Sequence, residues 1–207
     1  MKLGQPLDQL FATFDMVPVA AASLAQVHRA TLADAKIVAV KVQRPNLERL
    51  VDRDLEAMEL GLRGLYWLFP RRMRRTNLLD FFAEFRRYTL QELDFTQEGR
   101  VIDRFRANFA GRSDVKFPVV HWGHTTERVL TMDWVECMRV GEAAGSLAPR
   151  EKQRLVTLLI DGMLQMYVSD RLFHADLHPG NIFFHRDGTF TLLDFGNPAA
   201  ARERIHT

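Results

Sequence analysis

The sequence predicts an α+β fold in which short strands and long helices occupy separate stretches of the 207 residues. Runs rich in valine, isoleucine and alanine lie at 17–32 and 36–45, and such runs are typical of strands. Residues 46–69 and 77–107 repeat apolar positions with helical spacing and contain almost no helix breakers. Hydrophobic residues make up 47% of the chain, so we expect a well-filled core.

Composition narrows the class of protein further. The formal net charge of +2 gives no general reason to expect nucleic acid as a partner. Cys137 is the single cysteine, which excludes an intramolecular disulfide and a cysteine-based metal cluster and fits a reducing compartment. No stretch reaches the roughly 18 uninterrupted apolar residues of a membrane span, and the first residues lack an apolar signal-peptide core. We therefore expect a soluble, cytoplasmic chain.

The first predicted elements follow one another in a simple order. Residues 7–14 have the apolar spacing of a short amphipathic helix. Residues 17–32 are predicted to form strand, loop and strand, and 36–45 a further strand that ends at Pro45. The two long helices come next, separated by the segment PRRMRRTN, in which Asn77 is the expected N-cap.

The second half of the chain adds strands, one helix and a hairpin. Strands are expected at 115–123 and 128–136. The wide apolar face of residues 149–170 predicts a helix. The turn RDG between IFFH and TFTLLDFG predicts a β-hairpin. The tail 197–207 carries no core pattern, so we expect it to fray.

Three residues near the carboxyl end have the types and spacing needed for phosphoryl transfer. Asp176 and Asn181 lie in HADLHPGN, and Asp194 begins DFG thirteen residues after Asn181. A carboxylate such as Asp176 can orient a nucleophile and accept its proton, while Asn181 and Asp194 offer the oxygen ligands that Mg²⁺ prefers. The spacing H-x-D-x-x-x-x-N followed by D-F-G matches the catalytic loop of kinases, with Ala175 where kinases usually have arginine.

The same segment permits two other interpretations. His174, Asp176 and His178 alternate, so in a strand they would place three metal ligands on one face and favour a metal-dependent hydrolase. Pro179 and Gly180 end any such strand at once, and no further histidine or cysteine cluster completes the site. A polar turn that caps a hairpin is the third interpretation, but it leaves the downstream DFG unexplained. We favour phosphoryl transfer.

Lys41 lies in the apolar strand VAVKVQ, where a charged side chain is costly unless it meets anions. Phosphates and a helix carboxylate would provide these anions. The candidate partners are Glu92, Asp94 and Glu98 on the second long helix, and we favour Glu98. The simpler alternatives are an edge-strand lysine that reaches solvent and a solvated acidic helix face. The order of strand, loop, lysine strand and helix is that of a kinase N-terminal lobe and favours the paired lysine.

The loop at the position of a glycine-rich phosphate loop reads AAAS, residues 20–23, and contains no glycine. Glycine allows positive φ angles, which let a backbone close over phosphates. Alanine restricts these angles, so we expect a stiffer loop that approaches a nucleotide differently.

Six segments carry a wider resemblance: PVAAASLAQVHRA, VAVKVQRP, QELDFTQEGR, VLTMDWVE, FHADLHPGN and LLDFG. Together, from Leu7 to Gly196, they resemble the UbiB/AarF atypical protein-kinase-like family. The resemblance implies a protein-kinase-like fold with an N-lobe sheet, inserted helices and the beginning of a helical C-lobe. It also implies binding of ATP or ADP and Mg²⁺, and an ATPase or small-molecule kinase activity of the phosphotransferase class in the full-length protein. The implied role is in ubiquinone or isoprenoid-lipid biosynthesis at a membrane.

The resemblance further implies roles for individual residues. Asp176, Lys41 and Glu98 would be catalytic, and Asn181 and Asp194 would hold the metal. The residues implied to bind the nucleotide are Ala20, Ala21, Ala22, Ser23, Lys41, Met132, Asp133, Trp134 and Val135.

The resemblance divides the chain into an N-lobe with a helical insert at 1–135, a partial C-lobe at 136–196 and a tail at 197–207. The family's K-x-G-Q element lies well upstream of the alanine-rich loop, whereas the KLGQ here stands only fourteen residues before it, which we interpret as accidental. The sequence after Gly196 departs from the family pattern, and the membrane-spanning tail of many members is absent. We therefore expect a C-terminally truncated member.

Two function classes remain beside the ATPase: a catalytically silent kinase-like module in a lipid-biosynthesis complex, and the metal-dependent hydrolase. The segment 70–87 contains six arginines beside Phe81, Phe82 and Phe85, as in helices that lie on anionic membranes. A solvated loop is the simpler interpretation, and we favour it. The expected partners are an adenine nucleotide, lipid-biosynthesis proteins and at most a peripheral anionic surface at the inner membrane, without nucleic acid.

Overall fold

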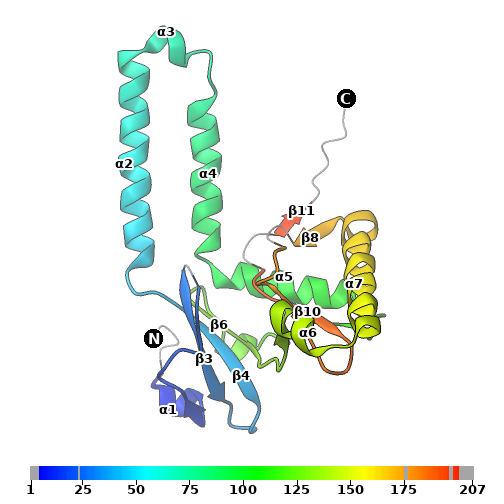
Figure 1. Ribbon diagram of the computed structural model, residues 1–207. Coiled ribbons are helices and arrows are strands. Elements are labelled where there is room, and N and C mark those ends of the chain that lie inside the picture. Colours follow the sequence, from blue (N-terminus) through cyan, green and yellow to red (C-terminus); the bar gives the residue numbers. More distant parts are fainter. Residues whose placement is uncertain (1–4, 23, 175–176, 196–197, 201–207) are drawn as a thin grey trace.

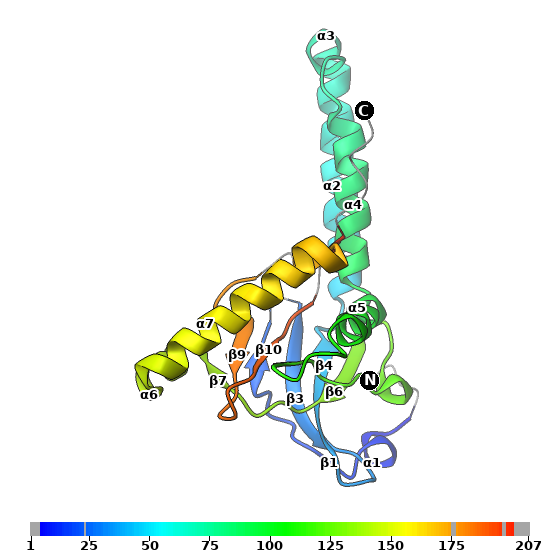
Figure 2. The same cartoon turned by 90° about the vertical axis from the view of Figure 1, so that its right-hand side faces the viewer.

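The computed structural model describes residues 5–22, 24–174, 177–195 and 198–200. Its architecture confirms the predicted α+β class, with an antiparallel sheet, a smaller second sheet and a helical hairpin that projects from the body (Figure 1). Figure 2 shows the hairpin edge-on, with α3 (Pro70–Met73) at its far end.

The first sheet has five strands, and all of its pairs are antiparallel. The bonded order is β1-β3-β4-β6, and β2 also pairs with β3. The strands are β1 (Thr13–Phe14), β2 (Ala20–Ala21), β3 (Ala25–Thr31), β4 (Ile37–Gln43) and β6 (Val129–Asp133). Their positions confirm the strands predicted within 17–32, 36–45 and 128–136.

Alternation along β4 sorts its side chains onto two faces of this sheet. Val38 and Val40 are fully buried on one face, in a cluster with Phe11. Ala39 belongs to the larger core cluster on the opposite face. Lys41 follows Ala39 by two residues and therefore shares its face.

The first helix is shorter than predicted. α1 (Leu7–Leu10) ends four residues before the predicted end at residue 14. Phe11 is extended, with φ −133° and ψ 138°, and the chain then pairs with β3 through β1. A single helical turn has few hydrogen bonds of its own, so pairing with the sheet is the more stable choice for residues 13–14.

The hairpin contains α2, the longest helix of the described chain. α2 (Leu47–Leu68) confirms the helix predicted over 46–69, and α4 (Leu78–Glu92) returns beside it (Figure 1). Asn77 stands at the N-cap of α4, as predicted, although its side chain makes no capping hydrogen bond. No helix in the described part of the chain is both long and apolar enough to cross a bilayer.

Few contacts hold the hairpin to the body, and they gather at its base. The Gln43 side chain, at the end of β4, donates a hydrogen bond of 3.0 Å to the Leu93 carbonyl, directly after α4. Arg128 forms an ion pair with Glu48 in the first turn of α2. The first contact closes the two ends of the hairpin against each other, and the second holds the start of α2 to the residue before β6.

The second predicted helix, over 77–107, is wrong as a single element. α4 ends at Glu92, and a separate helix, α5 (Phe95–Asn108), begins after a turn. Asp94 is the N-cap of α5, because its carboxylate accepts hydrogen bonds from the Thr96 backbone N–H at 2.9 Å and the Thr96 hydroxyl at 2.7 Å. This capping side chain satisfies a donor that a continuous helix would have paired internally.

The second sheet has the order β5-β10-β9-β7, with β5 parallel to β10. Its strands are β5 (Val115–Lys116), β7 (Met138–Arg139), β9 (Ile182–Phe184) and β10 (Phe190–Leu192). β9 and β10 confirm the predicted hairpin. The strand predicted over 115–123 is mostly wrong, since Pro118 lacks a backbone N–H and a 3₁₀ turn, η1 (Trp122–His124), follows.

The remaining elements complete the carboxyl half. α7 (Pro149–Leu164) continues as a π-helical turn, η2 (Gln165–Asp170), and the two together match the predicted helix 149–170. α6 (Val140–Ser146) was not predicted. β8 (Leu172–His174) pairs with β11 (Pro198–Ala200), so residues 198–200 of the predicted tail are paired. Residues 201–207 lie outside the described chain.

α5 forms the centre of the core, between the first sheet and the second. Phe95, Ile102 and Phe105 are buried on it, in one cluster with Leu130 of the first sheet and Phe190 of the second. α5 therefore holds a fixed position relative to β4 and to the chain after β10.

The cap at Asp94 fixes where α5 begins. We expect Asp94→Ala to lower the free energy of unfolding by about 1 kcal/mol, because an N-terminal N–H of the helix loses its acceptor. Asp94→Ser should retain most of the stability. Urea unfolding followed by circular dichroism measures both, with Asp54→Ala on exposed α2 as the control that should change little. Equal losses from Asp94→Ser and Asp94→Ala would contradict the capping role.

Candidate functional site

Lys41 is the buried cation of the site. Its side chain is 9% exposed, and its Nζ donates hydrogen bonds to Glu98 Oε1 and Oε2, each at 2.9 Å. A third hydrogen bond, of 3.1 Å, goes to Asp194 Oδ1. The structure thus joins a strand, a helix and the segment after β10 through one ammonium group.

The protonation of Lys41 follows from these contacts. Burial lowers the pKa of Lys41, but the carboxylates of Glu98 and Asp194 outweigh burial, and the net pKa is raised. Burial also raises the pKa of Glu98, opposed by the contact with Lys41. Lys41 therefore stays charged at neutral pH. Since a buried ion pair costs much of its attraction in desolvation, its presence is better explained by a task than by stability.

Only Glu98, of the three candidate acids, contacts Lys41. It lies one turn into α5 and also accepts a hydrogen bond from the backbone of Phe195. Asp94 is engaged as the N-cap, and Glu92 is the exposed last residue of α4, on the far side of the turn. The pairing favoured from the sequence is therefore present, although the single helix assumed for it is not.

Asp194 has a backbone conformation that is unusual for its residue type. Its φ of 64° lies in the left-handed region, which non-glycine residues occupy at a cost. Its side chain is 46% exposed, unlike those of Lys41 and Glu98. One carboxylate oxygen therefore binds Lys41 while the group remains open to solvent, as a metal or phosphate site would require.

Phe195 connects the site to the core. Its ring lies 5.2 Å from Phe105 of α5 and 5.1 Å from His174 of β8, measured between centroids. Phe117 lies against both phenylalanines, at 5.7 Å from Phe105 and 5.9 Å from Phe195. The His174 Nε2 donates to the Leu193 carbonyl at 3.1 Å. This ring cluster fixes the chain on both sides of Asp194.

Asn181 is buried and held through its backbone. Its N–H donates to the His178 carbonyl at 2.9 Å, and its carbonyl accepts from the Leu193 N–H at 3.0 Å. The His178 Nδ1 accepts from the Gly180 N–H at 2.9 Å. A Cβ on Gly180 would lie 2.6 Å from the His178 ring, so a larger residue there would displace this ring from its hydrogen bond. In this arrangement both His174 and His178 make hydrogen bonds that shape the loop.

These residues surround one pocket of about 430 Å³. Every described residue to which the resemblance assigns a nucleotide, catalytic or metal role lines it: Ala20, Ala21, Ala22, Lys41, Glu98, Met132, Asp133, Trp134, Val135, Asn181 and Asp194. Ser23 and Asp176 lie outside the described residues. The pocket thus gathers the predicted site from both halves of the chain, while the individual roles stay predictions.

The segment that leaves β6 forms one wall of the pocket. The Asp133 N–H donates to the Val119 carbonyl at 2.9 Å, and the Trp134 N–H donates to the Ile37 carbonyl at 3.1 Å. The Asp133 carboxylate also accepts from His121 Nε2 at 2.8 Å. These bonds give the wall a defined backbone path between the two sheets.

Sequence reasoning missed part of the lining. The additional residues are Val19, Val27, Ala39, Cys137, Arg139, Gly180, Phe183 and Leu193. Ala39 precedes Lys41 by two residues, and Val27 pairs with Lys41 on the neighbouring strand. Strand alternation therefore indicates that both side chains lie on the same face as Lys41. Phe183 and Leu193 depend on how the second sheet sits against the first, which no local pattern reveals.

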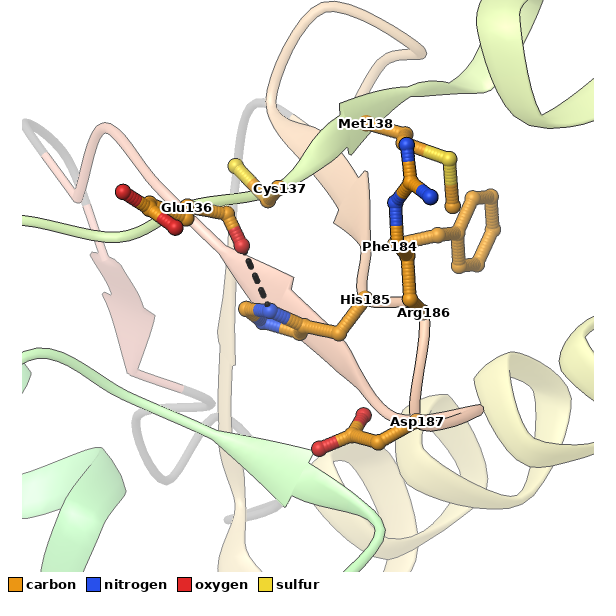
Figure 3. A pocket seen from close by; sticks show the side chains of 7 residues that line it. All are labelled: Glu136, Cys137, Met138, Phe184, His185, Arg186 and Asp187. Carbon is orange, nitrogen blue, oxygen red and sulfur yellow. Dashed lines mark hydrogen bonds between the residues drawn. The ribbon is translucent and has the colours of Figure 1, made fainter.

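A second pocket, of about 470 Å³, lies beside the wall and shares Cys137 with the first (Figure 3). His185 lies in it, with Nδ1 donating to the Glu136 carbonyl at 3.0 Å and Nε2 accepting from the Thr191 hydroxyl at 2.6 Å. Burial, with a smaller effect from Lys116, lowers the pKa of His185, so the ring is neutral near pH 7. Both ring nitrogens are occupied, and His185 serves to tie the β9–β10 hairpin to the wall.

The donor set fits magnesium better than a transition metal. Asn181 and Asp194 offer amide and carboxylate oxygens to the pocket, the ligand types that Mg²⁺ prefers. Within the described ranges no group of three or more histidine, cysteine, aspartate and glutamate side chains is arranged to hold a metal ion. The hydrolase triad of the sequence includes Asp176 and so extends outside those ranges.

The chain resembles proteins of one family throughout its length. A profile described as the ABC1 atypical kinase-like domain matches residues 1–206. Protein ACTIVITY OF BC1 COMPLEX KINASE 1, chloroplastic, of Arabidopsis thaliana is 37% identical over 208 residues, covering 98% of this chain and 30% of that protein. An uncharacterised protein of Synechocystis sp. is 35% identical over 199 residues, covering 94% and 34%. The chain spans about a third of the length of these curated relatives.

A solved structure shows the same architecture. The complex of Rv3197 with erythromycin from Mycobacterium tuberculosis matches with a TM-score of 0.83 and 28% identity, covering 96% of this chain and 49% of that one. Together with the profile match, it confirms the kinase-like fold expected from the sequence.

A double-mutant cycle tests how the buried pair depends on its partners. We expect Lys41→Met to lower the free energy of unfolding by on the order of 3 kcal/mol, because Glu98 is left buried without its cation. Glu98→Leu should cost less, because Lys41 keeps Asp194. The double variant should be more stable than the sum of the two losses predicts. Urea unfolding measures all three, and strictly additive losses would show that the pair is not coupled.

Proposed function

We propose a nucleotide-dependent function for this chain, which belongs to the ABC1 atypical kinase-like family. The pocket binds an adenine nucleotide together with Mg²⁺, and the full-length protein is an ATPase or a small-molecule kinase. The observation that carries the proposal is Lys41, buried between Glu98 and Asp194 at the wall of the pocket. A cation held in this way is positioned for the phosphates of a nucleotide.

We assign a separate role in phosphoryl transfer to each of several pocket residues. Glu98 orients Lys41, which binds phosphate oxygens. Asn181 and Asp194 hold the metal, and Asp176, which lies outside the described residues, orients the phosphoryl acceptor and takes its proton. Bound Mg²⁺ supplies neutralisation of charge on the phosphate oxygens.

The nucleotide base lies in the apolar part of the pocket. Met132, Asp133, Trp134 and Val135 form the wall against which the adenine packs. The short strand Ala20–Ala21 is exposed and covers the pocket from the other side. Its alanines take up the positive φ angles of a glycine-rich loop only at a cost, so we expect phosphate binding to depend more on Lys41 and the metal than on backbone N–H groups.

The wider role is a proposal for the full-length protein. It supports ubiquinone or isoprenoid-lipid biosynthesis, associates with the biosynthetic proteins and lies peripherally at the cytoplasmic side of the inner membrane. In this proposal residues 1–135 form the N-lobe and residues 136–196 the start of the C-lobe. The arrangement of the pocket between the two sheets supports that division.

A catalytically silent binding module is the second candidate. The observation that favours it is the glycine-free segment Ala20–Ala22, which lines the pocket without the flexibility of a phosphate loop. A metal-dependent hydrolase that uses His174, Asp176 and His178 is the third. A hydrolase of this kind requires a bound transition metal. If elemental analysis of the purified protein finds no transition metal, this candidate is excluded.

Nucleotide binding tests the site directly. We expect ATP to bind more tightly with Mg²⁺ than with EDTA, and Asp194→Asn to remove at least about tenfold of the affinity for the magnesium complex, because a charged ligand is lost. Lys41→Met should weaken binding under both conditions. Isothermal titration calorimetry gives the affinities.

Lys152→Met, on α7 and away from the pocket, is the matched control and should bind as the unaltered chain does. Circular dichroism must show the same helix content for every variant. If ATP bound equally well with both Lys41 and Asp194 replaced, the site assignment would be wrong.

Turnover separates the enzyme from the silent module. We expect magnesium-dependent phosphate release from ATP by the full-length protein, and we expect Asp176→Asn to bind nucleotide normally but to lose this release, because the acceptor is no longer oriented. A phosphate-release assay measures it. Tight nucleotide binding without any release, also in the presence of membranes, would favour the silent module.

A further inference from the structure

We infer that the hairpin tip, residues 67–75, rests on the surface of an anionic lipid bilayer. The tip comprises the end of α2, the short helix α3 and the two residues that follow it. It lies outside the nucleotide pocket and plays no part in the proposed phosphoryl transfer. The inference extends the lipid-linked role proposed above to a particular surface of the molecule.

The tip exposes large apolar side chains that a purely solvated loop would not need. Trp67 is 81% exposed, Leu68 is 60% exposed and Phe69 is 53% exposed. Trp67 and Leu68 lie in the last turn of α2 and Phe69 is its C-cap, so all three are exposed at the same end of the hairpin. Tryptophan and phenylalanine are the residues that favour the boundary between lipid headgroups and acyl chains.

The charge at the tip has one sign. Arg71, Arg72, Arg74 and Arg75 are all exposed, and no ion pair among the described residues involves them. No aspartate or glutamate occurs between Leu60 and Leu79. The whole chain carries only +2, so the four tip arginines do not merely reflect a generally basic chain. Basic residues beside aromatic ones match an anionic headgroup layer above an apolar interior.

An apolar groove continues from the tip along the hairpin. It has a volume of about 410 Å³ and lies between α2 and α4, lined by Leu62, Leu65, Leu78, Phe81 and Phe85 among others. Phe81 is 68% exposed. Leu65 and Phe85, which also line the groove, are 42% and 43% exposed. Acyl chains just below the headgroups would cover the end of the groove nearest the tip, at Leu65 and Leu78.

The shape of the molecule permits this contact. The tip is the part of the hairpin farthest from the sheets (Figures 1 and 2). α2 has 22 residues and is therefore about 33 Å long, so a flat surface can reach the tip before it meets the body. Because no described helix is long and apolar enough to cross a bilayer, the contact is interfacial.

Vesicle cosedimentation tests the inference without any nucleotide, so it can fail while the proposed phosphoryl-transfer function holds, and the reverse. We expect the chain to sediment with vesicles of phosphatidylcholine containing about 30 mol% phosphatidylglycerol, and not with phosphatidylcholine alone. Reversing all four tip arginines to glutamate should lower the vesicle partition coefficient at least about tenfold.

The matched control reverses four exposed arginines elsewhere: Arg49, Arg53, Arg100 and Arg104. It changes the net charge equally but should lower the partition coefficient by less than about twofold, because these positions lie away from the tip. Equal losses from both sets would show a general charge effect and overturn the inference. So would binding of the unaltered chain to neutral vesicles only, or to none.

The apolar part of the tip has its own variants. We expect Trp67→Ser with Phe69→Ser to lower partitioning about tenfold at unchanged charge, because the inserted surface is lost. Val156→Ser with Ile160→Ser, a similarly exposed pair on α7, is the control and should have no effect. Unchanged partitioning of the Trp67 and Phe69 variant would overturn insertion.

The same variants test whether the tip binds nucleic acid instead of lipid. If the chain bound a short DNA duplex through the four tip arginines and failed to bind vesicles, the partner would be a nucleic acid and the inference would fail. All altered side chains are exposed, and circular dichroism with a thermal melt confirms that each variant is folded.

Discussion

The arrangement of the molecule depends on one ammonium group. Lys41 binds Glu98 and Asp194 at the same time, and the three residues come from β4, α5 and the segment after β10. These elements belong to the first sheet, the central helix and the second sheet. The hydrogen bonds of Lys41 therefore help to fix the relative positions of these three parts. The pocket opens where they meet, because the same residues line it.

The rest of the core supports this contact from behind. Phe195, directly after the strained Asp194, packs against Phe105 of α5 and His174 of β8. The rings fix the direction in which Asp194 points, and the cap at Asp94 fixes the first turn of the helix that carries Glu98. A cost in backbone conformation at one residue is therefore balanced by ordinary packing on both sides of it.

Sequence reasoning predicted the site better than the path of the chain. A lysine in an apolar strand requires an acid, and Glu98, the favoured candidate, is the acid that Lys41 meets. The chemistry that HADLHPGN and DFG indicate stays a prediction. The sequence does not indicate the break before α5, because Asp94 and Glu98 are four residues apart and also fit one face of a continuous helix. β7 and β8 are too short for a periodicity of their own, and each is defined by its pairing with a strand distant in sequence. Asp176 and Ser23 remain predictions, as do the roles of all the pocket residues.

The closed base of the hairpin also bears on how the chain folds. Lys41 and Glu98 are 57 residues apart, and bringing such distant residues together is entropically slow. Most of that separation is the hairpin, whose two helices can form and associate through contacts between near neighbours in sequence. Once Gln43 meets Leu93 at its base, the loop that remains between the lysine and the glutamate is short. The hairpin thus lowers the effective contact order of the buried pair, so the pair can assemble early even though a long insert separates its members.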